Sequence, residues 1–175
     1  SILSLSTNDI SDRSSSYFDS EESLTVYEIV NAFEYASYDD DVEIVFLDLS
    51  YLSISSVSAY EVGKSIQLLK KNGKKVIAYG DFLSQSQYLL ASYADEIILN
   101  PFGMVFLEGF KKYQIYLKDF LDNNNIVVNT FVAGDYKSAT EIFSESKMTE
   151  QDRQQSKIFL NDLWRNWLKE VSNNR

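Results

Sequence analysis

Residues 42–49 read VEIVFLDL, a nearly continuous apolar run that is rich in β-branched side chains. Such a run is typical of a strand covered on both faces, as in a parallel sheet. A second short run follows at 74–79 (KKVIAY), and between the two Val62, Ile66 and Leu69 repeat with the spacing of one helix face. Together these elements predict a strand–helix–strand unit with parallel strands.

Apolar runs and helical stripes also alternate on either side of this unit. The further elements expected, in chain order, are a strand at 2–5, a helix on Val26, Val30 and Phe33, a helix at 84–94, a strand at 95–99, a helical stripe at 113–121, a strand at 126–132, and a long helix with the capping-box pair Thr149 and Asp152. The pattern predicts the α/β class, with a mostly parallel sheet and flanking helices in a single domain over residues 1–175. The polar stretch 6–22 is predicted to be a mobile loop. The start within a strand suggests a piece of a longer protein.

Charge and composition limit the partners of the chain. Its 175 residues carry a formal net charge of −10, and the isoelectric point is about 4.5. Neither nucleic acid nor an anionic membrane surface is therefore expected as a partner. No stretch reaches the roughly 20 apolar residues of a membrane-spanning helix.

Two residue types are missing, and their absence limits the chemistry. The chain has no histidine, which excludes a Ser-His-Asp or Cys-His arrangement within it. It has no cysteine, which excludes thiol nucleophiles, disulfides and cysteine-rich zinc sites. Acid–base chemistry must therefore come from carboxylates, tyrosines or lysines.

Two motifs that could bind phosphate or a metal ion do not fit those roles. Gly63-Lys64 resembles the end of a phosphate-binding loop, but Ser58 stands where that loop needs a glycine. The run of three aspartates at 39–41 favours a solvated turn, because consecutive carboxylates cannot all face one ion. No cofactor and no metal site are expected.

Residues 81–86 (DFLSQS) lie where a strand passes into a helix, a place where α/β enzymes often present a nucleophile. Ser84 or Ser86 could be such a nucleophile. Serine is also a preferred helix cap, and no histidine is present to activate it. The pattern therefore favours a helix cap over a nucleophile.

Three segments resemble the tandem-domain signal peptide peptidases, the protease IV family of Ser–Lys serine proteases with a crotonase/ClpP-like fold. Residues 79–101 are similar to the strand–turn–helix–strand segment of that family. Residues 132–143 (VAGDYKSATEIF) are similar to the Tyr-Lys-Ser-Ala pattern around its general-base lysine, with Ile142 where proline is usual. Residues 160–175 resemble its closing Leu-Trp helix.

The resemblance implies that Lys137 is the catalytic general base. Its spacing alone would make Lys137 an ordinary surface lysine. In the tandem form, the nucleophilic serine belongs to a C-terminal half that this chain lacks. Gln85 stands at the position of that serine. The stretch 52–55 (LSIS) replaces a glycine-containing loop whose backbone N–H helps to form the oxyanion hole.

General-base catalysis requires a neutral Lys137, whereas an ordinary lysine is almost entirely protonated at neutral pH. Burial against the partner half would lower its pKa by destabilising the ammonium form. Glu141 stands four residues later, and on a helix it would pair with Lys137 and keep it charged. We therefore expect either a non-helical loop or a Glu141 side chain that points elsewhere.

The resemblance further implies the setting of the parent protein. Its substrates would be remnant signal peptides and other apolar segments, cleaved on the periplasmic face of the bacterial inner membrane. Its anchor would lie outside this chain, and its partners would be the C-terminal half and further copies of the parent. Two alternatives stay open: a non-catalytic assembly module in which Lys137 is structural, and an acyl-CoA hydratase or isomerase of the same fold.

Overall fold

The computed structural model describes residues 2–6, 24–129 and 138–175, with the backbone alone for 2–6, 138 and 139. Its internal contacts divide the chain into two compact units. Unit 1 comprises Ser1–Glu108 and Trp167–Arg175, and unit 2 comprises Gly109–Asn166. The single domain expected over residues 1–175 stays a prediction, and the loop expected at 6–22 lies, apart from Ser6, outside the described residues.

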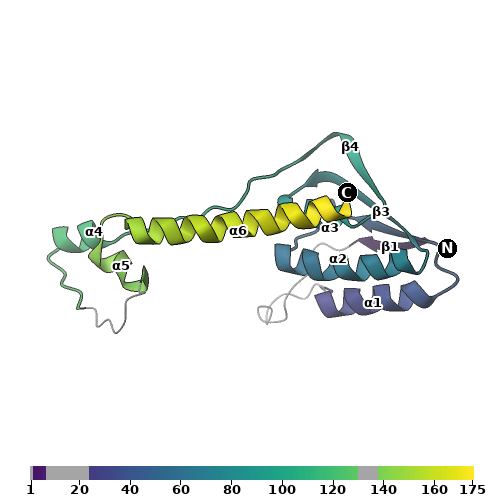
Figure 1. The fold of residues 1–175 in the computed structure, drawn as a ribbon, viewed down its shortest axis with the longest axis horizontal. Helices are drawn as coiled ribbons and strands as arrows, with labels where there is room; N and C mark the ends of the chain where they lie inside the picture. Colours follow the sequence, from purple (N-terminus) through teal and green to yellow (C-terminus); the bar gives the residue numbers. More distant parts are fainter. Residues whose placement is uncertain (1, 7–23, 130–137) are drawn as a thin grey trace. The chain divides into compact units, whose positions relative to one another are not determined.

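Unit 1 contains a parallel sheet whose strands follow one another in the order β1-β2-β3-β4 (Figure 1). The strands are β1 (Ile2–Ser6), β2 (Ile44–Asp48), β3 (Lys75–Leu83) and β4 (Glu96–Val105). Between β2 and β3, Val45 pairs with Val76 and Leu47 with Ala78. The predicted parallel sheet is therefore confirmed, and β4 is longer than the strand expected at 95–99.

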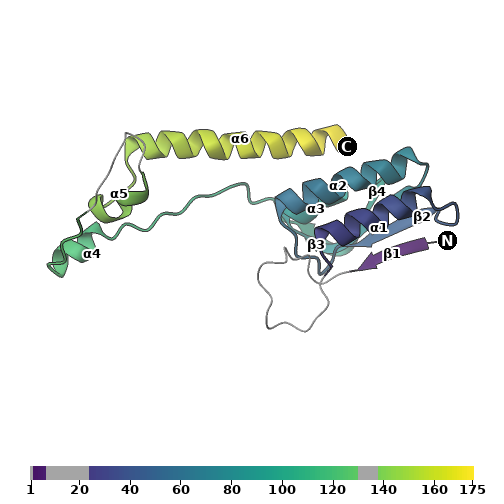
Figure 2. The ribbon, with the colours of Figure 1, turned by 90° about the horizontal axis from the view of Figure 1, so that it is seen from below.

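The connections between these strands are helices with well-defined caps. They are α1 (Val26–Tyr38), α2 (Ser56–Lys71) and α3 (Gln85–Ser92), and α1 and α2 pack side by side (Figure 2). Thr25 caps α1 in a capping box, in which its hydroxyl accepts from the N–H of Glu28 and the Glu28 carboxylate accepts from the N–H of Thr25. The helix α2 ends at Lys71 with Asn72 as its C-cap, and the following Gly73 has a φ of 80°.

The core of unit 1 lies between the sheet and the helices. Val45, Leu47, Val76 and Ala78 are buried on the face covered by helices. On the other face the rings of Phe46 and Tyr79 stack with their centroids 6.3 Å apart. Strand residues thus alternate between full and partial burial.

The ring of Tyr93 fills the space beside α2. A Cβ atom added at Gly63 would lie 2.3 Å from Cε2 of Tyr93, so only glycine fits there. The Tyr93 hydroxyl donates to the Glu170 carboxylate at 2.7 Å, and the Lys64 ammonium donates to the same carboxylate oxygen at 3.0 Å. Glu170 belongs to α6 (Glu150–Asn174), so these contacts anchor the last residues of α6 to the sheet-and-helix core of unit 1.

Unit 2 contains α4 (Lys118–Asn123), α5 (Ser138–Ser144) and the first part of α6. Residues 109–117, which lead into α4, have no regular secondary structure. None of the helices in the described residues is both long and apolar enough to cross a membrane.

Two predicted elements differ from the structure in unit 2. The helix expected at 113–121 begins only at Lys118, and the N–H of Leu117 instead donates to the carbonyl of Ile142 at 2.7 Å. The strand expected at 126–132 is absent from residues 126–129, and 130–132 lie outside the described residues. Asn125, with a φ of 55°, turns the chain out of α4. An apolar run forms a stable strand only where it can pair with a neighbouring strand.

The Glu170 contacts predict how the stability of the chain depends on pH. Burial raises the pKa of Glu170, but the hydrogen bonds from Tyr93 and Lys64 outweigh this, so its pKa is lowered. The resulting stabilisation is present above the pKa of the unfolded carboxyl, about 4.3, and is lost as the pH falls through the folded value. The free energy of unfolding, measured by urea denaturation, is therefore expected to fall as the pH decreases below about 5. Glu170→Gln should flatten this dependence, whereas the control Glu61→Gln, at an exposed α2 position, should keep it.

Candidate functional site

The junction between β3 and α3 is held by a capping box. The Ser84 hydroxyl accepts from the N–H of Gln87 at 3.3 Å, and the N–H of Ser84 donates to Oε1 of Gln87 at 2.6 Å. Ser84 is therefore the helix cap that the sequence favoured. The other candidate, Ser86, has its hydroxyl 2.9 Å from that of Ser56. A neutral hydroxyl cannot serve as a general base at neutral pH, so this contact does not activate Ser86.

Gln87 also ties this junction to the loop after β2. Its buried side-chain amide donates to the carbonyl of Leu49 at 2.8 Å and to the carbonyl of Leu52 at 2.7 Å. The stretch 52–55, where the resemblance implies the counterpart of an oxyanion loop, thus directs a carbonyl toward α3. An oxyanion hole needs N–H donors at that place. At this place the loop instead presents backbone carbonyls, which accept hydrogen bonds.

A second polar cluster lies on β3 and β4. Asp81 accepts hydrogen bonds from the Tyr79 hydroxyl at 2.7 Å and from the Asn100 amide at 2.8 Å, and these two bonds lower the pKa of Asp81. The hydrogen bond to Asp81 is also the main cause that raises the pKa of Tyr79. At neutral pH the carboxylate is therefore ionised and the phenol is neutral, which suits a structural pair rather than a proton donor and acceptor.

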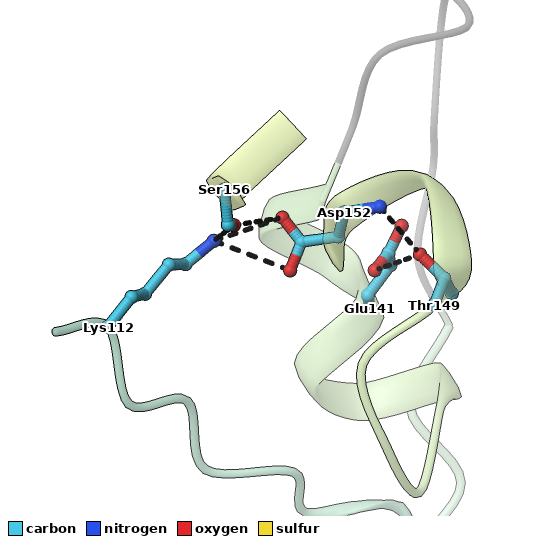
Figure 3. Close-up of polar contacts among 5 residues, drawn as sticks. All are labelled: Lys112, Glu141, Thr149, Asp152 and Ser156. Carbon is cyan, nitrogen blue, oxygen red and sulfur yellow. Dashed lines mark hydrogen bonds and ion pairs between the residues drawn. The ribbon is translucent and has the colours of Figure 1, made fainter. Parts of the chain in front are cut away.

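Unit 2 contains a lysine–serine contact that sequence reasoning did not identify (Figure 3). The ammonium of Lys112 donates to the Ser156 hydroxyl at 2.9 Å and to the two carboxylate oxygens of Asp152 at 2.9 and 3.3 Å. The Asp152 side chain is only 5% exposed, so its charge depends on this pairing. The ammonium is held between this buried carboxylate and the hydroxyl, and these contacts join the segment before α4 to α6. Lys112 and Ser156 therefore form a structural contact.

The N-terminus of α6 shows half of the predicted capping box. The Thr149 hydroxyl accepts from the N–H of Asp152 at 3.2 Å, as expected for a cap, whereas the Asp152 carboxylate pairs with Lys112. The Thr149 hydroxyl donates in turn to Oε2 of Glu141 on α5, also at 3.2 Å (Figure 3). A hydroxyl has one proton and two lone pairs, so both bonds form together.

Lys137, the predicted general base, lies outside the described residues. It is the residue before α5 in the sequence, and Glu141 is four residues further on. Two alternatives were expected, a non-helical loop or a Glu141 side chain that points elsewhere. Residues 138–144 form the helix α5, in which Glu141 accepts a hydrogen bond from Thr149. Nothing in the described residues tests the role of Lys137.

In the part of the chain that the structure describes, no group of three or more histidine, cysteine, aspartate or glutamate side chains could hold a metal ion.

Comparisons with known proteins identify the family. A profile of Peptidase family S49 matches residues 68–175. The chain is 36% identical over 153 residues to Protease 4 of Haemophilus influenzae, an alignment that covers 87% of this chain and 25% of that protein. It is 36% identical over 152 residues to Protease 4 of Salmonella typhi, with coverages of 86% and 25%. It is 27% identical over 163 residues to the chloroplastic serine protease SPPA of Arabidopsis thaliana, with coverages of 93% and 24%. The chain therefore belongs to Peptidase family S49.

Family membership confirms two predictions: the relationship to protease IV and the crotonase/ClpP-like α/β class. The chain spans about a quarter of the length of the curated relatives that it matches. A serine peptidase family and a parallel α/β fold are thus established. The role of this part within a complete protease is a separate question.

The hydrogen bonds of Gln87 lead to a prediction about stability. Gln87→Leu removes a donor from the carbonyls of Leu49 and Leu52 and the acceptor of the capping box. The Leu49 carbonyl keeps the N–H of Leu52, so the Leu52 carbonyl and the N–H of Ser84 lose their bonds to Gln87. A buried polar group without a partner costs about 1–3 kcal/mol, so the free energy of unfolding should fall by about 2 kcal/mol or more. The control Gln67→Ala, at an exposed position on α2, should change it by less than about 0.5 kcal/mol. Urea denaturation of the two variants checks this, and equal stability would contradict the bonding scheme.

Proposed function

We propose that this chain supplies the general-base lysine, Lys137, to a Ser–Lys peptidase whose nucleophilic serine comes from another segment of the parent protein. Three facts support the proposal: membership of Peptidase family S49, the Tyr-Lys-Ser-Ala sequence at 136–139, and relatives about four times as long as the matched region.

The observation that best supports the proposal is the arrangement of hydrogen-bond donors and acceptors at the β3–α3 junction. In this chain, Ser84 is a helix cap, Gln85 occupies the position of the nucleophile in the family pattern, and the adjoining loop presents carbonyls to Gln87. An acyl-transfer site there would lack both an activated hydroxyl and N–H donors for the developing oxyanion. This arrangement supports the proposal that the serine and its oxyanion hole come from another segment of the parent protein.

The proposed reaction transfers an acyl group in two steps. A neutral Lys137 amine accepts the proton of the serine hydroxyl while the serine oxygen bonds to the peptide carbonyl carbon. As the tetrahedral intermediate collapses, the C–N bond breaks and the proton passes from the lysine to the leaving amine. Water then hydrolyses the acyl-enzyme with the same lysine as base, which restores the free serine and releases the carboxylic acid product.

The setting that we propose for the parent follows from its relatives in the protease IV family. Its substrates are apolar peptides, including remnant signal peptides, and it acts at the bacterial inner membrane on the periplasmic side. Its anchor and its C-terminal half lie outside this chain. The complete protein is expected to form oligomers. The low isoelectric point of this chain supports peptides rather than nucleic acid as ligands.

The isolated chain is expected not to hydrolyse peptides or activated esters above background, because it has a base without nucleophile or oxyanion donors. Assay of the purified chain with a fluorogenic apolar peptide checks this. Turnover that is lost in the Ser84→Ala/Ser86→Ala double variant would show that a local serine is the nucleophile. Turnover that survives those changes but is lost in Lys137→Ala would overturn the proposed division of roles.

In the full-length parent, Lys137→Ala should lower kcat/KM for the peptide by at least about a thousandfold while folding is retained. Lys147→Ala is the matched control, since Lys147 is an exposed lysine close by in the sequence. Ser156→Ala tests the Lys112–Ser156 contact and should leave activity within a few-fold of wild type. Activity retained in Lys137→Ala would favour a non-catalytic assembly module. Activity lost in Ser156→Ala would indicate that Lys112, and not Lys137, is the catalytic lysine.

A further inference from the structure

The pair Asn72–Gly73 directly follows α2, and it is the only Asn-Gly pair in the chain. An asparagine followed by glycine is the pair most prone to deamidation, because glycine has no Cβ to hinder the approach of its nitrogen to the asparagine side chain. Gly73 is exposed, so the water that the reaction consumes is at hand. The pair therefore meets the chemical requirements of a modification site, and the proposed peptidase mechanism does not use it.

Deamidation of such a pair proceeds through a cyclic intermediate. The backbone nitrogen of Gly73 loses its proton to solvent and bonds to the side-chain carbonyl carbon of Asn72. The bond from that carbon to the side-chain nitrogen breaks, and the nitrogen takes up a proton from water and leaves as ammonia. Water then opens the five-membered ring at one of its two carbonyl carbons. The product is aspartate or isoaspartate, and no cofactor is needed.

In the folded chain both reacting groups are engaged elsewhere. The N–H of Gly73 donates to the carbonyl of Lys70 at 3.0 Å, and the side-chain amide of Asn72 donates to the Ser37 hydroxyl of α1 at 3.2 Å. Asn72 has a ψ of 17°, and ring closure requires rotation far from this value, because the nitrogen of Gly73 must turn toward the side chain. The fold thus holds the pair in an unreactive arrangement until the end of α2 opens.

The contact with Ser37 accepts an amide at position 72 but not a carboxylate. Ser37 is only 2% exposed, and its hydroxyl donates to the carbonyl of Glu34 at 2.7 Å. Its single proton is therefore in use, and the hydroxyl accepts from Asn72. A carboxylate at position 72 has no N–H to donate, and its charge would lie at the C-terminal end of α2, where the helix dipole disfavours it. Deamidation would therefore weaken the contact between α1 and α2.

We propose that Asn72–Gly73 is a site of spontaneous deamidation, which the C-cap of α2 and the Ser37 hydroxyl keep unreactive in the folded protein. The site reacts when the last turn of α2 opens, since helix ends open at a lower cost than the whole fold. The isoaspartate product has an extra carbon in the backbone, which displaces the N–H of Gly73 from the carbonyl of Lys70. The product therefore disfavours closing of the turn, and the change is irreversible.

The test is the rate of deamidation at position 72 in the full-length parent, folded in buffer or unfolded in guanidinium chloride at the same pH. Chymotryptic cleavage after Leu69 and Tyr79 releases the peptide 70–79, in which mass spectrometry detects the replacement of the side-chain NH2 by OH. The folded protein is expected to react at least about tenfold more slowly than the unfolded protein, because the reaction requires local opening. This comparison needs no variant.

Ser37→Ala tests the contact that holds the Asn72 side chain. The variant should deamidate about threefold faster or more in the folded state, because one hydrogen bond that opposes opening is gone. Ser65→Ala is the matched control. Ser65 is also buried, and its hydroxyl donates to the carbonyl of Val62 at 2.7 Å, within α2 itself. Both variants lose a bond from a serine hydroxyl to a helix carbonyl, and only Ser37→Ala should change the rate.

The possible results separate the site from its protection. An unfolded protein that stays intact at position 72 would show that no such site exists. Equal rates in the folded and unfolded protein would show that the fold gives no protection. An unchanged rate in Ser37→Ala, or equal acceleration in Ser65→Ala, would overturn the role of the Ser37 hydroxyl. None of these measurements depends on peptidase activity, so they stand or fail apart from the proposed function.

Discussion

The architecture of unit 1 depends on the junction between the loop after β2 and the start of α3, where two backbone carbonyls need hydrogen-bond donors. The carbonyls of Leu49 and Leu52 face the protein interior, where an acceptor without a donor is costly. The amide of Gln87 satisfies both, and its oxygen accepts from Ser84. One side chain therefore joins the loop after β2 to the start of α3. The same bonds leave this junction without the donors that acyl transfer needs.

In the described residues of unit 2, charge and hydrogen bonding are prominent. Asp152 is buried there, whereas Tyr113, Ile115 and Val127 are more than three-quarters exposed. Polar contacts join its segments: Lys112 contacts Asp152 and Ser156, and Thr149 donates to Glu141.

Much of the fold could be predicted from the sequence, and the failures have physical causes. The strands β2 and β3 were predictable because their apolar runs are nearly continuous, although only alternate residues such as Val45 and Val76 are fully buried. The apolar run at 126–129 lacks a neighbouring strand, and pairing is not visible in a single segment. The contacts of Gln87 and Lys112 were not predicted, because in a sequence a polar residue whose partners are distant cannot be told from a surface residue. The sequence pattern at Ser84 and Thr149 did identify caps, whose partners are local. The proposed role of Lys137 as a base came from family resemblance alone.

The close approach of Gly63 to the Tyr93 ring has an evolutionary consequence. A side chain at position 63 would overlap a ring that is itself held by Glu170. Neither position can change freely while the other is kept, so the two form a covarying pair. A relative with alanine or a larger residue at the first position is expected to carry a smaller residue at the second. The carboxylate at position 170 would then lose the phenol as a donor and keep only the Lys64 ammonium of these two, which extends the coupling to three sites on α2, the end of α3 and α6.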